Sequence, residues 1–126
     1  MENKELIIKK CNQCGVIVKE IKKGNCVENK IICCEKEMQT QVANSVDAAV
    51  EKHIPMYEIK ENKIYVKVNH VMEEEHYIEW ISLVSDKEEI TINLQPNEKA
   101  EVVFPMIEKA TLYAYCNKHG LWKKEM

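Results

Sequence analysis

Four cysteines near the start of the chain have a spacing that suits a metal ion. Cys11 and Cys14 are separated by two residues and form one chelating pair, and the adjacent Cys33 and Cys34 offer a second. Neighbouring residues of an extended chain point to opposite sides, so the second pair reaches one ion only with distortion from ideal tetrahedral geometry. Four thiolates around one ion select zinc or iron. From these residues alone, a structural zinc staple and a redox-active iron both remain open.

The four histidines and the last cysteine of the chain could form a second site. Cys116 and His119 have a spacing that lets one tight turn present a sulfur and a nitrogen to the same ion. His70 and His76 bracket a loop between two predicted strands, and His53 lies just before the first strand of the same region. If the loops cluster at one end of a β-sandwich, these five groups can converge.

Such a set of ligands would suit redox chemistry better than a structural role. Four imidazoles and one thiolate exceed the four ligands that structural zinc prefers, and they leave one octahedral position open. Imidazole accepts zinc, copper, iron or nickel, so the spacing does not name the metal. A thiolate opposite the open position would push electron density onto whatever binds there. The chemistry indicated is electron transfer to a small oxygen species.

The elements that must position these residues are predicted to be mostly β. Residues 1–38 have short β-like runs and too few apolar residues for an independent core, so we expect a small module that a metal staples. Residues 39–126 open with an expected short helix over 42–50 and continue with runs of alternating apolar residues. Short strands at regular intervals favour a β-sandwich, and the predicted strands are 56–59, 64–68, 77–83, 90–94, 101–104 and 111–115.

Composition and charge argue against several classes of partner. All 18 basic residues are lysine, and 21 acidic residues bring the net charge to −3. Without arginine the chain has no bidentate contacts to phosphate or guanine, so we expect no nucleic-acid partner. No apolar run approaches the roughly 20 residues that span a bilayer, and the opening residues are charged, unlike a signal peptide. We therefore expect no membrane partner and a cytoplasmic location.

Taken together, these motifs resemble the desulfoferrodoxin family, the two-iron superoxide reductases. The resemblance rests on the two cysteine pairs and on segments 51–55, 70–78 and 116–120, which follow the family's order over nearly the whole chain. It implies a desulforedoxin-like four-Cys iron module over 1–38 and an immunoglobulin-like superoxide reductase domain over 39–126. It further implies reduction of superoxide to hydrogen peroxide with electrons from a rubredoxin-type donor, by a homodimer in anaerobic or microaerophilic cells.

The resemblance also implies roles for individual residues. Two iron ions per chain are expected: an FeS4 centre held by Cys11, Cys14, Cys33 and Cys34, and a catalytic iron held by His53, His70, His76 and His119 with Cys116 as the axial thiolate. Glu51 matches a carboxylate that can occupy the sixth position in the oxidised resting state, and Lys52 matches the cation beside the open site. A lysine there could attract an anion to a negatively charged protein and orient a water that supplies protons.

A second hypothesis is a protein without catalytic activity, either an electron carrier or a zinc-stapled module attached to a binding sandwich. Such a protein would contain the four-Cys site but no open coordination position. Two irons per chain with a thiolate-to-iron charge-transfer band would favour the enzyme. Zinc alone, in a colourless protein, would favour the binding module.

Overall fold

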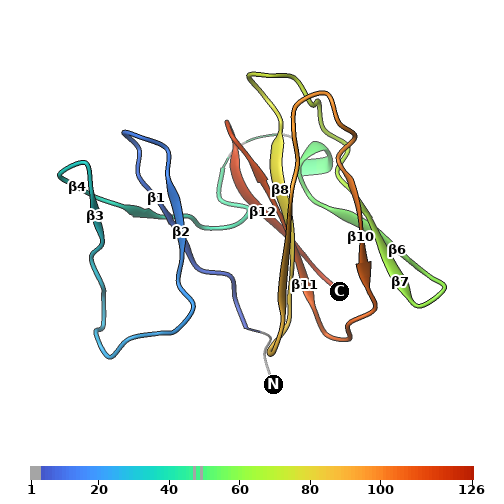
Figure 1. The fold of residues 1–126 in the computed structure, drawn as a ribbon, viewed down its shortest axis with the longest axis horizontal. Coiled ribbons are helices and arrows are strands. Elements are labelled where there is room, and N and C mark those ends of the chain that lie inside the picture. Colours follow the sequence, from blue (N-terminus) through green and yellow to red (C-terminus); the bar gives the residue numbers. More distant parts are fainter. Residues whose placement is uncertain (1–3, 47, 49) are drawn as a thin grey trace. The chain divides into compact units, whose positions relative to one another are not determined.

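The chain folds into two compact units, whose regular secondary structure in the described residues is β-strand apart from one 3-10 turn (Figure 1). The computed structural model describes residues 4–46, 48 and 50–126, and the side chain of Glu51 lies outside this description. One unit is Leu6–Val42, and the other comprises the rest of the described chain. Within the described residues, no helix is long and apolar enough to cross a lipid bilayer. The predicted predominance of β-structure is confirmed.

The larger unit is a sandwich of two antiparallel sheets. One sheet has the order β10-β7-β6, formed by Glu101–Pro105, Lys63–Lys67 and Met56–Lys60. The other has the order β12-β11-β8-β9, formed by Gly120–Glu125, Thr111–Cys116, Ile78–Val84 and Glu89–Asn93. The first, second and fifth strands of the sandwich thus share one sheet, and the third, fourth, sixth and seventh share the other. This is an immunoglobulin-like arrangement, as expected from the sequence.

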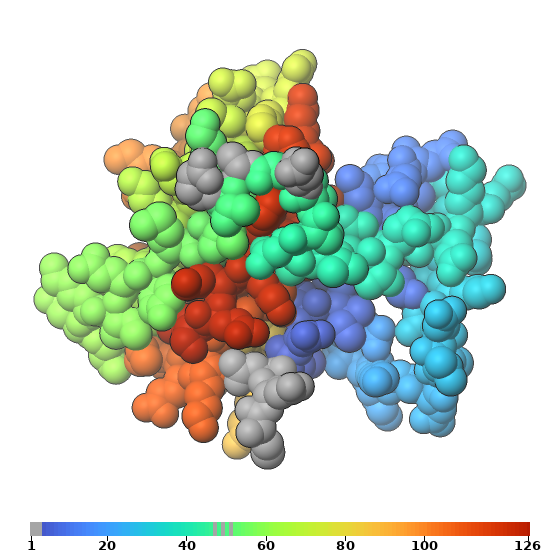
Figure 2. All heavy atoms as spheres, turned by 180° about the vertical axis from the view of Figure 1, so that it is seen from behind, coloured from blue at the N-terminus to red at the C-terminus, as the bar shows by residue number. Residues whose placement is uncertain are grey.

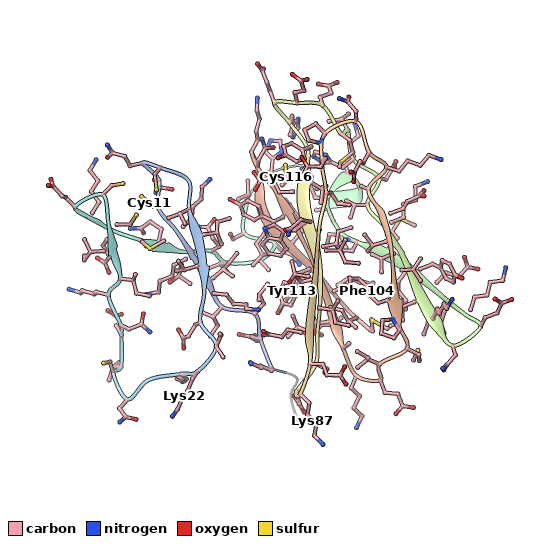
Figure 3. All side chains as sticks on the ribbon, in the orientation of Figure 1. Cys11, Lys22, Lys87, Phe104, Tyr113 and Cys116 are labelled. Atoms are coloured by element: carbon pink, nitrogen blue, oxygen red, sulfur yellow. The ribbon has the colours of Figure 1, made fainter. Side chains whose placement is uncertain are left out.

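The core of the sandwich lies between the two sheets. Along β7 and β10, buried and exposed residues alternate, because successive side chains of a strand point to opposite faces. Phe104, which is 1% exposed, lies between the sheets in Figure 3. Strand β11 is buried along its whole length, since it is flanked by β12 and β8 in the centre of its sheet. The site-bearing loops are therefore attached to a rigid, well-packed scaffold.

The hairpin of β6 and β7 follows directly from its turn residues. Glu61 and Asn62 both have a positive φ, at 53° and 63°, which is the backbone of a type I′ turn. This turn matches the right-handed twist of the flanking strands and sets the register that pairs Lys60 with Lys63. The predicted strands 56–59 and 64–68 are confirmed, and they pair as a hairpin.

The smaller unit has little core of its own. Its sheet has the order β2-β1-β5, formed by Ile17–Lys19, Ile8–Lys10 and Gln39–Thr40, and a separate hairpin pairs β3, Ile32–Cys33, with β4, Lys36–Glu37. The buried apolar side chains of this unit are Leu6, Ile8, Cys11 and Met38. Several larger aliphatic side chains, including Ile21 and Val27, are exposed. A unit with so few buried side chains needs a further constraint to hold its fold.

The short helix expected over 42–50 is wrong for the described part of that segment. Asn44 has a φ of +59°, which interrupts a right-handed helix, and its side chain accepts a hydrogen bond from Lys123 N at 3.0 Å. Segment 43–46 (teal) lies beside β12 (red) in Figure 2, so it covers the outer edge of a strand that we did not predict. Ala49, which belonged to the expected helix, lies outside the described residues. A single 3-10 turn, Val50–Lys52, follows.

Candidate metal centres

Five potential ligands of the larger unit come together at one end of the sandwich. His53 follows the 3-10 turn, His70 and His76 lie in the loop between β7 and β8, and His119 lies in the turn between β11 and β12. Cys116 is the last residue of β11, and Figure 3 shows it at that end of the sandwich. The ligand atoms of all five residues lie within 4.8 Å of one another. The strand pairing thus brings together groups that are up to 66 residues apart in the sequence.

The four imidazoles form a closed ring. In the order His53, His70, His76, His119 and back to His53, the distances between ring centroids are 4.7, 4.6, 5.0 and 4.8 Å. Each neighbouring pair meets edge to face, with interplanar angles of 65° to 89°. Four nearly equal sides describe a square of donors around a common centre.

The spacing of the donor atoms suits a single metal ion. The distance from His53 Nε2 to His119 Nδ1 is 3.0 Å, and two nitrogens about 2.1 Å from one ion and at right angles lie about 3.0 Å apart. Cys116 Sγ lies 3.4 Å from His70 Nε2 and 3.8 Å from His119 Nδ1. The sulfur is fully buried, whereas three of the four imidazoles are half-buried. The sulfur therefore lies on the protein side of the cluster, and the imidazoles of His70, His76 and His119 are its parts that reach solvent.

Two contacts orient particular imidazoles. His70 Nδ1 lies against the carbonyl oxygen of Val71, which can only accept, so Nδ1 carries the proton and Nε2 is left with a free electron pair. Trp122 stacks on His53, and its indole N–H donates to the carbonyl oxygen of His119 at 3.1 Å. Sequence reasoning missed Trp122, although its place three residues after a candidate ligand was a signal that could have found it.

The electrostatics of the cluster favour a metal ion over protons. Burial, together with the other imidazoles, lowers the pKa of His70 and of His76, so both rings stay neutral and able to donate an electron pair. Burial raises the pKa of the Cys116 thiol. His76 Nε2 is buried with no hydrogen-bond partner among the described residues. A bound cation would give this nitrogen a partner and would stabilise the thiolate, so the residues fit a metal.

In the smaller unit, four sulfurs form a second cluster. The distances are 3.7 Å between Cys14 Sγ and Cys33 Sγ and 3.9 Å between Cys33 Sγ and Cys34 Sγ. Sulfurs about 2.3 Å from a tetrahedral ion lie about 3.8 Å apart. The sulfurs of Cys11, Cys14, Cys33 and Cys34 all lie within 4.8 Å of one another, and Cys26 is an exposed thiol outside this cluster.

Backbone turns bring both cysteine pairs into this geometry. Cys34 and Glu35 have φ values of 52° and 65° and form the turn between β3 and β4, so the chain at Cys34 is not extended. The chain reverses at this pair, and both neighbouring sulfurs lie within 4.8 Å of the sulfurs of the first pair. At the first pair, Gly15 has a φ of +85° and its N–H donates to the Cys11 carbonyl at 2.9 Å. This closes the loop between Cys11 and Cys14.

Hydrogen bonds within the second cluster prepare it for a cation. The backbone N–H of Cys14 lies 3.5 Å from Cys11 Sγ, and this contact lowers the pKa of Cys11 to about 6. Hydrogen bonds with Cys11 and Cys14 raise the pKa of Cys33 to about 12. Cys11 is thus held as a thiolate next to the Cys33 thiol. Binding of a metal ion would displace the protons that remain on the cysteines of the cluster.

The two remaining predicted site residues lie next to His53. Lys52 ends the 3-10 turn and is exposed. The backbone of Glu51 belongs to the same turn, but its side chain lies outside the described residues. Lys52 is therefore available to the solvent, directly before His53 in the chain.

Comparison with known proteins supports both centres. The family model described as Desulfoferrodoxin matches residues 45–125. The desulfoferrodoxin of Desulfarculus baarsii is 42% identical over 125 residues, covering 95% of this chain and 96% of the relative. That of Syntrophotalea carbinolica is 40% identical over 125 residues, covering 96% and 97%. The crystal structure of the superoxide reductase from Treponema pallidum matches with a TM-score of 0.74 and 28% identity, covering 96% of this chain and 99% of that one.

Proposed function

Because the chain belongs to the desulfoferrodoxin family, we propose that it is a superoxide reductase with two iron ions, one in each candidate centre. The observation that carries this proposal is the closed ring of four imidazoles beside one buried sulfur. That set could hold an ion through five ligands, and an ion with six coordination positions would keep one free for a small substrate. A purely structural zinc site would use four ligands and leave no open position.

Each part of the larger centre has a role in this reaction. Iron held there supplies the one electron that, with two protons, converts superoxide to hydrogen peroxide. The imidazoles of His53, His70, His76 and His119 would hold this ion through their nitrogens, and the buried sulfur of Cys116 would be its fifth ligand. The substrate anion is therefore confined to the solvent-facing side, where water can deliver protons. Water is kept from the thiolate by the core beneath it.

Lys52 and Glu51 are proposed to act on the open side. Lys52 is an exposed cation directly before His53, in a protein whose net charge of −3 repels superoxide. Its ammonium group would attract the anion locally and orient a water molecule that donates a proton. Glu51 is proposed to supply a carboxylate to the sixth position in the oxidised resting state. This role rests on the family resemblance of segment 51–55.

The smaller centre is proposed to hold an FeS4 ion that accepts electrons from a rubredoxin-type donor. Cys14 and Cys34 are exposed, so a donor can approach this ion closely. Exposed aliphatic side chains of the same unit, such as Ile21, Val27 and Ile32, are compatible with a homodimer that would cover them. We propose a cytoplasmic location, because a reducing compartment keeps cysteines available as metal ligands.

The proposal is tested by metal analysis, electronic spectra and pulse radiolysis on one anaerobically prepared sample. We expect about two irons per chain, separate bands for the FeS4 ion and for the Cys116 thiolate bound to iron, and rapid loss of superoxide without release of dioxygen. Cys116→Ser should abolish the second band and leave the first unchanged. A wild-type protein loaded with two irons that does not react with superoxide would refute the proposed activity and favour an electron carrier.

A further inference from the structure

Asn117 makes three hydrogen bonds to the backbone on both sides of His76. Its backbone N–H donates to the Tyr77 carbonyl at 3.2 Å, and its Oδ1 accepts from Tyr77 N–H at 3.0 Å. Its Nδ2 donates to the Glu75 carbonyl at 2.9 Å. One side chain therefore fixes the residue before His76 and the residue after it.

These bonds are made where the regular ladder between β11 and β8 ends. The register shifts between Tyr115 and Cys116, so that Cys116 pairs with Ile78. Beyond that point the Asn117 side chain makes the hydrogen bonds that peptide groups make within the ladder. Its Oδ1 accepts from Tyr77 N–H, and its Nδ2 donates to the Glu75 carbonyl. The turn that carries Cys116 and His119 is thereby linked directly to the loop that carries His76.

His76 depends on this link more than the other imidazoles do. His70 is oriented by the Val71 carbonyl, and Trp122 braces His53 and His119. For His76 Nε2, by contrast, no hydrogen-bond partner is found among the described residues.

The loop around His76 packs on the core through Met72 at its start, whereas the run 73–75 before His76 is exposed. Glu73 and His76 exchange two backbone hydrogen bonds, at 3.0 and 3.1 Å, which close a tight turn on the exposed run 73–75. Farther from His76, Asn97 N–H holds the start of the loop at the Met72 carbonyl, at 2.7 Å. The end of the loop, where the ligand lies, is held by Asn117.

We propose that Asn117 is a positioning residue for His76, and that its carboxamide keeps this imidazole in the plane of the metal centre. The inference rests on the proposed metal centre and not on the identity of the substrate. Because Asn117 immediately follows Cys116, it also couples the position of the fourth nitrogen to that of the sulfur. Loss of the carboxamide should free the end of the loop and weaken the metal–His76 bond, while the other four ligands remain in place.

The experiment measures the affinity of the full chain for cobalt(II), with the sulfur cluster of the smaller unit as an internal standard. We expect Asn117→Ala to weaken binding at the imidazole site by about tenfold or more and to change the visible bands of that site, with the sulfur cluster unchanged. Asn117→Asp keeps the acceptor for Tyr77 N–H and loses the donor to Glu75, so its loss should be smaller if its added charge does not disturb the loop.

The matched control is Ser85→Ala. The Ser85 hydroxyl likewise bonds to both the N–H and the carbonyl of one residue, Glu88, in the same unit, but it does not flank a ligand. We expect this variant to bind cobalt like the wild type. Equal losses in the two alanine variants would show a general effect on stability and would overturn the proposal.

A double-mutant cycle with His76→Ala shows whether the effect passes through His76. In that background Asn117→Ala should change the cobalt affinity by less than twofold, because the ligand that it positions is absent. An additive tenfold loss, or wild-type affinity and bands in Asn117→Ala alone, would refute the inference. Failure of the iron-loaded protein to reduce superoxide would refute the proposed function and leave these affinities unaffected.

Discussion

The indole of Trp122 stacks on the imidazole of His53, with 4.8 Å between the ring centroids and 23° between the ring planes. The same indole donates a hydrogen bond to the carbonyl oxygen of His119. Trp122 is 1% exposed, so one core side chain braces two adjacent corners of the imidazole ring. The geometry of the metal centre is therefore coupled to the packing of the sandwich.

We expect Trp122→Phe to keep an aromatic surface against His53 and to lose the N–H donor together with part of the ring volume. This variant should lose about 1–3 kcal/mol of unfolding free energy and shift the absorption of the iron in the imidazole site. Trp122→Ala should cost about 3–5 kcal/mol, because it leaves a cavity in the core. Urea unfolding and visible spectra on the same samples check both expectations. An unshifted spectrum in both variants would show that the indole does not position the ligands.

Lys52→Ala should slow the bimolecular reaction with superoxide by about two- to tenfold at low ionic strength. The difference should shrink as salt is added, since an exposed charge is screened over about 10 Å at 0.1 M. The iron spectrum should not change, because Lys52 is exposed and its role is electrostatic. Pulse radiolysis over a range of salt concentrations measures the effect. Lys60→Ala, at the far end of β6, is the matched control and should react like the wild type.

Removing metal with a chelator should unfold the smaller unit before the larger one. Residues 6–42 bury few apolar side chains and expose Ile21 and Val27, so the ion at the four sulfurs supplies much of their stability. The sandwich has a continuous core and should keep its fold. Amide hydrogen exchange followed by mass spectrometry should show loss of protection in residues 6–42 alone. Retained protection there after complete metal removal would contradict this dependence.

The metal-free sandwich should be most stable between about pH 6.5 and 8.5. The pKa values of His70 and His76 are lowered in the folded state, so below about pH 6.5 the unfolded chain binds more protons and stability falls. The pKa of Cys116 is raised, so above about pH 8.5 the unfolded chain releases its proton more readily and stability falls again. Urea unfolding of metal-free protein at several pH values measures both limits. A midpoint that continues to rise below pH 6 would contradict the lowered imidazole pKa values.

Much of the fold follows from local patterns in the sequence. The alternation along 64–68 and 101–104 predicts strands with one buried face, and the structure confirms both. The helix expected over 42–50 does not form in the described part of that segment. Its apolar residues have helical spacing but do not pack against a core, since Val42, Val46 and Val50 are all exposed. Strand β12 was missed because its residues do not alternate: the apolar Leu121 and Trp122 are adjacent, and three charged residues follow them.

The types and spacing of the histidines and cysteines identify two groups of potential ligands, because donor chemistry is a property of single residues and of short turns. The three-dimensional arrangement is decided elsewhere. Strand pairing closes the square of imidazoles, a positive φ at Cys34 turns two neighbouring sulfurs to one side, and the side chains of Trp122 and Asn117 brace the ring. These relationships join residues tens of positions apart or depend on the sign of a single backbone angle. The spacing of residues along the sequence does not reveal long-range contacts or the sign of a backbone angle. Only the folded chain therefore determines where an ion can bind and which side of the site stays open.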